Sequence, residues 1–318
     1  MELDQVRQQS DQIREGLQRV FAGQPDLLDQ LIGTFFAGGH ALLEGVPGVG
    51  KTLIVKALAR LLGLEFRRVQ FTPDLMPSDI IGTETFQLAT QSFQLRKGPI
   101  FTTILLADEI NRTPPKTQAG LLEVMEERTV SLGNETHRLS PLFTVFATQN
   151  PVEYEGTYPL PEAQVDRFLT KLLVKYPTAE EDLQILEQYN QGHDLHRFAV
   201  DQLSPVTSAE QVLACRERIR QIRATPDVLR YISQIVRSTR EHPDVQLGAS
   251  PRAAIHLFLL SQAIAGSNGR EFVTPDDIKS AAPAVLRHRI LLTAEAQVSA
   301  RTADQIAAEV LDRIEVPR

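Results

Sequence analysis

The chain has 318 residues, and 42% of them are hydrophobic, which is enough to bury the cores of about two domains and excludes a disordered protein. Its 33 Lys and Arg residues against 40 Asp and Glu residues give a net charge of −7, which argues against a surface that coats nucleic acid as a whole. The single cysteine, Cys215, allows no internal disulfide and favours a reducing cytoplasm. We expect neither a signal peptide nor a membrane span, because no apolar stretch has the required pattern and length.

The first part of the chain has the pattern of an α/β domain. Residues 3–20 carry apolar side chains three, four and seven positions apart, which predicts a helix with a charged outer face. From there to about residue 176, short apolar runs alternate with helical patterns. Several of these runs are apolar at consecutive positions, as expected when helices cover both faces of a parallel sheet. The predicted strands are residues 40–44, 66–70, 102–107, 142–148 and 169–174.

The pattern after residue 177 is helical, with no convincing strand. Signals for the start of a helix recur in this part. In each signal, a Ser or Thr can cap free backbone amides, and proline takes the first helical position, where its missing N–H costs nothing. These signals are Thr225-Pro226, Ser250-Pro251 and Thr274-Pro275. We therefore predict an α/β domain with an N-terminal helix in residues 1–177 and an all-helical domain in residues 178–318.

A glycine-rich loop follows the first predicted strand and leads into an apolar helical run. Residues 45–52 read Gly-Val-Pro-Gly-Val-Gly-Lys-Thr, which is a phosphate-binding pattern in its required strand–loop–helix context. Glycines let the backbone wrap a phosphate, the helix start attracts negative charge, Lys51 bridges the outer phosphates and Thr52 can ligate magnesium. A chance glycine-rich turn is the alternative, and the context disfavours it. The predicted nucleotide-binding residues are Gly45, Pro47, Gly48, Val49, Gly50, Lys51, Thr52 and Leu53.

Two acidic residues end the buried strand 102–107. Ligands of open α/β sheets lie at the carboxyl ends of strands, so Asp108 and Glu109 should face the phosphates. We predict that Asp108 holds Mg²⁺ through a water, together with Thr52, and that Glu109 polarises the attacking water. The alternative is an acidic cap after a core strand. The guanine-reading Asn-Lys-x-Asp element is absent from the sequence, which favours ATP as the nucleotide.

Two further polar residues are candidates for the hydrolysis site. Asn150 ends the strand 142–148 and could place its amide beside the γ-phosphate, although taken alone it is more simply a turn residue before Pro151. Arg167 is either a surface partner of Asp166 or a finger that reaches a neighbour's nucleotide. Spacing alone does not decide between the two interpretations of Arg167.

Six runs of the sequence, in this order, resemble the AAA+ ATPase superfamily and, within it, the MoxR family. They are EGVPGVGKT at 44–52, FTPDLMPSD at 71–79, DEINRTPPK at 108–116, ATQNP at 147–151, YPLPEAQVDRF at 158–168 and LGASPR at 247–252. The resemblance implies a P-loop domain with a parallel sheet between helices, followed by an all-α lid. It implies these roles: Walker A at 45–52, Walker B at Asp108 and Glu109, sensor 1 at Asn150, arginine finger at Arg167 and sensor 2 at Arg252.

Arg252 has its own alternative. Behind the Ser250 cap it would lie in the first turn of a lid helix and could reach the phosphates across the domain cleft. Otherwise it is a solvated arginine at a helix start, which the helix dipole disfavours by about 0.3 to 1 kcal/mol. The basic triplet 287–289 is similar to triplets in family members, and it could lie at a subunit contact or on a solvated helix face.

The family also implies two insertions, which are expected at 83–97 and 129–140, the second with a turn at 132–135. In relatives such insertions face the centre of a ring, whereas their simpler interpretation is two surface hairpins. Gly23 and Gln24 fall where relatives contact adenine, mainly through backbone.

The resemblance implies an Mg²⁺-dependent ATPase that works in a homo-oligomeric, hexameric ring to remodel, mature or activate protein clients, with a von Willebrand factor A domain protein as partner. Because Arg167 should lie at the far edge of its own domain, we expect it to serve a neighbouring subunit, where an arginine finger is worth about 10³ to 10⁵ in rate. A nucleic-acid motor or loader ATPase is the rival, which the acidic charge disfavours. A nucleotide-gated scaffold with negligible turnover is a third option, which Glu109 and Arg167 argue against.

Overall fold

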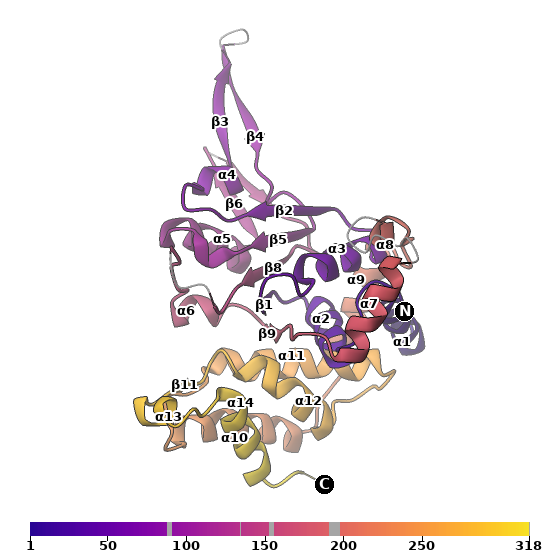
Figure 1. The fold of residues 1–318 in the computed structure, drawn as a ribbon, viewed down its shortest axis with the longest axis vertical. Coiled ribbons are helices and arrows are strands. Elements are labelled where there is room, and N and C mark those ends of the chain that lie inside the picture. Colours follow the sequence, from indigo (N-terminus) through magenta and orange to yellow (C-terminus); the bar gives the residue numbers. More distant parts are fainter. Residues whose placement is uncertain (88–90, 134, 153–155, 191–197, 318) are drawn as a thin grey trace.

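A five-stranded parallel sheet forms the centre of the protein (Figure 1). The computed structural model describes residues 1–87, 91–133, 135–152, 156–190 and 198–317. All the strands predicted for this sheet are present, and every neighbouring pair is parallel. Their order across the sheet is β2 (Phe66–Gln70), β5 (Ile104–Asp108), β8 (Thr144–Gln149), β1 (Ala41–Glu44) and β9 (Thr170–Leu173).

Helices cover both faces of this sheet. Because successive side chains of a strand point to opposite faces, consecutive apolar residues serve two cores. Leu43 and Leu106 pack on the face of α1, α2 and α3, whereas Leu42 and Leu105 pack on the face of α5. The predicted N-terminal helix is α1. The helices and the 3₁₀ turn of this part are α1 (Leu3–Gln18), α2 (Pro25–Phe36), α3 (Lys51–Leu61), α4 (Pro77–Ile81), η1 (Ile110–Arg112), α5 (Pro115–Glu127) and α6 (Glu162–Val165).

The two predicted insertions are β-hairpins. The first, of β3 (Gly82–Gln87) and β4 (Ser92–Lys97), projects far from the sheet (Figure 1). The second consists of β6 (Thr129–Leu132) and β7 (Glu135–Arg138), and residue 134 of its predicted turn lies outside the described residues. The hairpins touch, since a Cβ added at Gly133 would lie 2.3 Å from the carboxylate of Glu84.

The second half of the chain is mainly helical, and its last part forms a lid. Helices α10, α11 and α12 begin at the three predicted prolines. A two-stranded ribbon of β10 and β11 was not expected, because segments of two and three residues are too short to show a period. The elements are α7 (Ala179–Asn190), α8 (Phe198–Asp201), α9 (Ala209–Arg220), α10 (Pro226–Glu241), β10 (Val245–Leu247), α11 (Pro251–Ser267), α12 (Pro275–Leu286), β11 (Leu291–Leu292), α13 (Ala294–Val298) and α14 (Ala303–Arg313).

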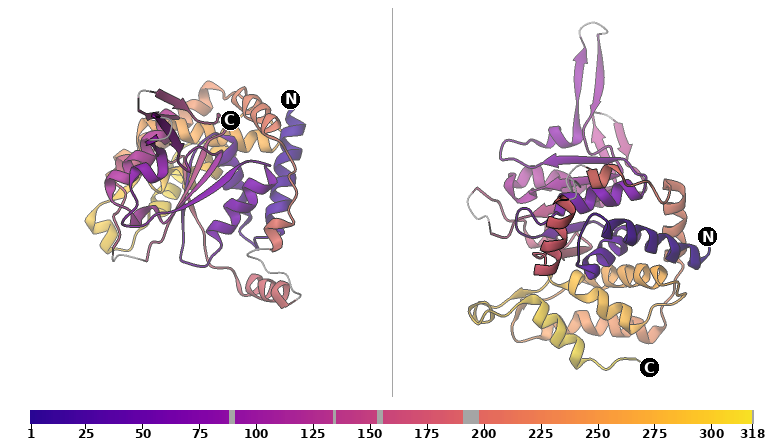
Figure 2. Two further views of the ribbon diagram at one scale, coloured as in Figure 1. Left: turned by 90° about the horizontal axis from the view of Figure 1, so that it is seen from above. Right: turned by 45° about the vertical axis from the view of Figure 1, so that its right-hand side comes forward.

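The lid packs beneath the sheet domain through α11, which contacts α1, α2 and α9 (Figure 2). One apolar core runs from α1–α3 into the lid, so the two parts are held together by buried side chains. The division at residue 177 stays a prediction. Within the part of the chain that the structure describes, none of the helices combines the length and apolarity that a bilayer crossing requires.

Candidate nucleotide-binding site

The loop after β1 needs its glycines. Gly48 and Gly50 have φ angles of 85° and 89°, in the left-handed region that residues with a side chain rarely adopt. A Cβ at Gly45 would lie 2.5 Å from the carbonyl oxygen of Val174 on the neighbouring strand segment. The loop therefore closes tightly against the sheet and opens toward the first turn of α3, whose amides attract anions.

Lys51, the first residue of α3, folds back over this loop. Its ammonium donates hydrogen bonds to the carbonyl oxygens of Gly45 and Val46, the latter at 2.9 Å. Pro47 and Gly48 are exposed at the outer part of the loop, whereas Val49 and Leu53 pack against the main apolar core. Two of the predicted loop residues are thus open to solvent, and two others anchor the loop and α3 to the core.

Asp108 lies at the end of β5 and accepts hydrogen bonds from the elements around it. The hydroxyl of Thr52 donates to its Oδ2 at 3.3 Å, and the hydroxyl of Thr148 donates to its Oδ1 at 2.5 Å. Arg68, on β2, places Nη2 2.7 Å and Nε 2.9 Å from the same Oδ2. A hydroxyl and a carboxylate are the hard oxygen ligands that Mg²⁺ prefers, so Thr52 and Asp108 fit the predicted ion.

Glu109 is held by side chains that sequence reasoning missed. Gln70 Nε2 donates to its Oε2 at 2.5 Å, and Arg112 Nε lies 3.2 Å from the same oxygen. Its backbone N–H donates to the Thr148 hydroxyl at 2.9 Å. Gln70 pairs with Asp108 in the β2–β5 register. The one sign of this role in the sequence is the place of Gln70 at the end of the predicted strand 66–70.

Asn150 makes the expected turn contact, and its place beside a γ-phosphate stays a prediction. Its Oδ1 accepts the backbone N–H of Val152 at 3.1 Å, which is the expected turn contact. Asn150 is also buried and directly follows β8, the strand between β5 and β1. It therefore lies between the acidic pair and the phosphate loop, and the carboxyl ends of three parallel strands bring all of these groups to one edge of the sheet.

Arg167 lies at the opposite edge. Its Nη1 donates to the carbonyl oxygen of Leu122 at 2.6 Å, and its side chain lines a cavity of about 190 Å³ together with His40. His40 directly precedes β1, whereas the phosphate loop directly follows it. Since a strand rises about 3.3 Å per residue, the step from His40 to Gly45 along β1 spans about 16 Å. Arg167 is thus remote from the phosphate loop of its own chain.

Arg252 departs from the expectation that it reaches its own phosphates across the domain cleft. The lid packs below the amino ends of the strands, so the first turn of α11 brings Arg252 into the same cavity as Arg167. There its Nη2 lies 2.7 Å from Glu126 Oε1 at the end of α5. Sequence spacing could not decide which edge of the sheet the lid would face.

The segment before α2 lies against the phosphate loop. A Cβ at Gly50 would lie 3.1 Å from the ring of Phe21. Gln24 has a φ of 50°, and its amide exchanges two hydrogen bonds with the backbone of Lys175, at 3.1 and 2.9 Å. The predicted adenine contact at Gly23 and Gln24 stays a prediction, now on a segment that borders the loop.

Comparison with known proteins gives consistent matches. Residues 40–170 match the model of the ATPase family associated with various cellular activities (AAA), and residues 237–310 match the AAA lid domain. The chain is similar to protein YeaC of Bacillus subtilis, with 46% identity over 95% of this chain and 93% of that protein. It is similar to chaperone MoxR1 of Mycobacterium tuberculosis, with 40% identity over 95% of this chain and 81% of that protein. A crystal structure of a protein from Cytophaga hutchinsonii assigned as an ATPase superposes with a TM-score of 0.90 at 39% identity, covering 99% of this chain and 97% of that one.

Proposed function

Because this chain belongs to the MoxR family of AAA+ ATPases, we propose that it hydrolyses Mg²⁺-ATP in a homo-oligomeric, hexameric ring and uses the cycle to remodel, mature or activate protein clients. One observation carries this proposal. The groups that can bind a triphosphate lie at the carboxyl edge of the sheet, where the parallel strands have their carboxyl ends. Arg167 and Arg252 lie together at the amino edge, where the strands begin.

The carboxyl edge supplies the binding half of the site. Lys51 and the loop amides would take the phosphate oxygens, and Thr52 and Asp108 would hold Mg²⁺, which would neutralise phosphate charge when bound. Glu109 is placed to orient and polarise the attacking water, because Gln70 and Arg112 fix its carboxylate. Asn150 lies between the two groups and would contact the γ-phosphate and the water.

The amino edge would supply the second half to a neighbouring subunit. A heterologous contact, in which one edge of each subunit meets the opposite edge of the next, closes into a ring when the rotation between neighbours divides a full turn. Arg167 would then act as an arginine finger worth about 10³ to 10⁵ in rate, and Arg252 would add a second cation. An isolated subunit should be nearly inactive, so assembly controls hydrolysis.

The output of the cycle rests on the family. One relative is named a chaperone, which supports work on protein clients. The von Willebrand factor A domain partner is proposed from the family resemblance alone. The net charge of −7 favours this function over a nucleic-acid motor or loader. The cytoplasmic location stays a prediction.

Mixed rings test the shared site directly. Arg167→Ala and Glu109→Gln should each bind ATP but lose steady-state turnover. When the two variants are assembled together, an interface that pairs Glu109 of one subunit with Arg167 of the next is intact, so phosphate release should recover. Mass analysis of differently tagged subunits checks that mixed rings form. Full turnover by Arg167→Ala alone, or no recovery in confirmed mixed rings, would contradict the proposal.

A further inference from the structure

Arg289 is buried in the joint between the lid and the sheet domain. Its side chain is 1% exposed, although it stands in the basic triplet for which the sequence suggested a subunit contact or a solvated face. Neither interpretation holds for Arg289. Its Nε lies 2.6 Å from Asp166 Oδ1, so the guanidinium is paired with the residue directly before Arg167.

The same guanidinium also holds the backbone around Arg167. Its Nη2 donates to the carbonyl oxygens of Asp166 at 2.8 Å and Phe168 at 2.6 Å, and its Nη1 donates to that of Leu169 at 3.2 Å. Carbonyl groups on both sides of Arg167 are therefore tied to one rigid, planar side chain. This arrangement fixes the position from which the Arg167 side chain extends.

His256, on α11, completes the environment of Arg289. The Arg289 Nη2 lies 2.6 Å from its Nδ1, and because a guanidinium nitrogen cannot accept a hydrogen bond, this ring nitrogen carries no proton. Burial, and next the charge of Arg289, lower the pKa of His256 to about 3. The imidazole is thus a neutral acceptor at working pH, and it links Arg289 to the helix that carries Arg252.

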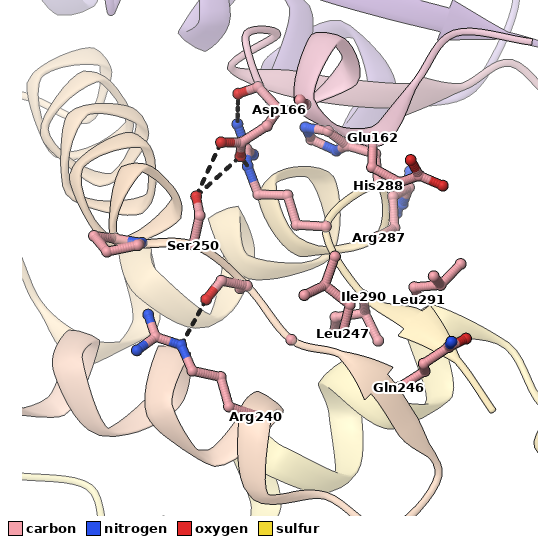
Figure 3. A pocket seen from close by; sticks show the side chains of 15 residues that line it. Glu162, Asp166, Arg240, Gln246, Leu247, Ser250, Arg287, His288, Ile290 and Leu291 are labelled. Carbon is pink, nitrogen blue, oxygen red and sulfur yellow. Dashed lines mark hydrogen bonds and ion pairs between the residues drawn. The ribbon is translucent and has the colours of Figure 1, made fainter.

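Asp166 makes the corresponding link to the start of α11. Ser250 Oγ donates to the two carboxylate oxygens at 3.1 and 3.0 Å. Figure 3 shows Ser250 and Asp166 facing each other in the lining of a pocket. Ser250 also accepts the backbone N–H of Ala253 at 3.3 Å, which caps the helix. Arg252 Nη1 lies 3.9 Å from the same carboxylate. One carboxylate therefore joins the Arg167 segment to the first turn that bears Arg252.

We propose that Asp166 and Arg289 are positioning residues that hold Arg167 and Arg252 at a fixed separation and tie both to the lid. This inference rests on the proposed active site that two subunits share. It assigns Asp166 and Arg289 to the half of that site that a subunit contributes to its neighbour. A displacement of the lid in one subunit would then move both cations at the next active site together. A one-ångström misplacement of such groups can lower the rate by about a hundredfold.

The main test uses Asp166→Asn, which keeps the size of the side chain and removes its charge. In complete rings we expect ATP affinity within about twofold of wild type and kcat lowered by about tenfold to a hundredfold. Mixed rings of Asp166→Asn and Glu109→Gln subunits should recover turnover. At some of their interfaces, the Asp166→Asn subunit supplies an intact Glu109 and the Glu109→Gln subunit supplies an intact Arg167 segment. Mixed rings with Arg167→Ala subunits should not recover.

Ser250 offers a second variant pair in case Asp166→Asn does not fold. Ser250→Ala should lower kcat and fall into the same complementation class as Arg167→Ala. Ser250→Thr keeps a hydroxyl for both Asp166 and the helix cap, so it should restore kcat.

A matched control separates positioning from stability. Arg270 and Asp277 form another ion pair within the lid, where the Asp277 side chain is 2% exposed and accepts from Arg270 Nη1 at 2.7 Å. Asp277→Asn should lower Tm without lowering kcat in folded rings. The inference is overturned if Asp166→Asn behaves like Asp277→Asn, or if Arg167→Ala rescues it while Glu109→Gln does not. If instead Arg167→Ala and Glu109→Gln fail to complement each other, the shared site itself is wrong.

Discussion

Arg68 and Asp108, on the neighbouring strands β2 and β5, form an ion pair with Nη2 2.7 Å from Oδ2. The Arg68 side chain is 50% exposed, whereas Asp108 is buried. The same Oδ2 accepts the hydroxyl of Thr52 at 3.3 Å, and these two residues are the proposed Mg²⁺ ligands. The guanidinium would therefore contact the same carboxylate that is predicted to hold the metal ion through a water, and the two positive charges would repel.

This contact predicts that Arg68 weakens Mg²⁺ binding. Arg68→Ala should lower the Mg²⁺ concentration needed for half-maximal nucleotide binding by up to about fivefold, because exposed ion pairs are weak. A fluorescent ATP analogue titrated with Mg²⁺ measures this without any turnover. Arg67→Ala is the matched control, since Arg67 is paired with Glu65 and not with Asp108. An unchanged or higher Mg²⁺ requirement for Arg68→Ala would count against the competition.

Glu109→Gln should separate binding from chemistry. The amide keeps the shape of the carboxylate but cannot polarise water, so we expect ATP binding to persist and single-turnover ADP formation to slow by about 10²- to 10⁴-fold. Glu65→Gln is the control, because Glu65 is an exposed carboxylate that pairs with Arg67. Rapid ADP formation by the Glu109 variant would exclude the assigned role.

Lys51→Ala should give the opposite phenotype. Its ammonium lies over the phosphate loop, so its loss removes charge-assisted hydrogen bonds to the triphosphate and should weaken ATP binding by about tenfold to a hundredfold. Lys56→Ala, five residues further along α3, removes a lysine that pairs with Asp201 instead. Calorimetric titration with ATP compares the two, and equal affinities would contradict the loop assignment.

His40 predicts a pH dependence of stability. Val145 N–H donates to its Nδ1 at 2.9 Å, so its Nε2 carries the proton and donates to the Met125 carbonyl at 3.2 Å. Burial, and next the charge of Arg128, lower the pKa of His40 to about 3. The unfolded chain, with a His pKa of about 6.5, binds more protons below that pH. The free energy of unfolding therefore falls as the pH decreases from about 6.5 toward 3.

His40→Gln isolates this contribution, because glutamine can accept and donate the same two hydrogen bonds but does not titrate. Between pH 7 and pH 5, wild type should lose about 2 kcal/mol more unfolding free energy than the variant. Urea unfolding followed by circular dichroism at both pH values measures the difference, in which the acidic groups common to both proteins cancel. Parallel pH profiles would show that His40 is protonated in the folded state.

The phosphate loop, the acidic pair after β5 and the proline helix starts were all predictable from sequence. Each depends on neighbours within a few residues: glycines that allow a positive φ, a strand that ends in carboxylates, or a cap before a proline. The partners of those residues were not predictable. Gln70 and Arg68 contact Glu109 and Asp108 only because β2 pairs with β5, about forty positions away along the chain.

Arg167, Arg252 and Arg289 show the same division. By itself the sequence determined the local elements, the nucleotide-binding loop and the family, because backbone conformation and apolar periodicity are short-range properties. Only the tertiary structure decided that Arg252 joins Arg167 at the amino edge of the sheet and that Arg289 is buried against Asp166. The non-consecutive strand order and the docking of α11 under α1 and α2 depend on burying apolar surface between distant segments, and no local pattern encodes which edge the lid then meets.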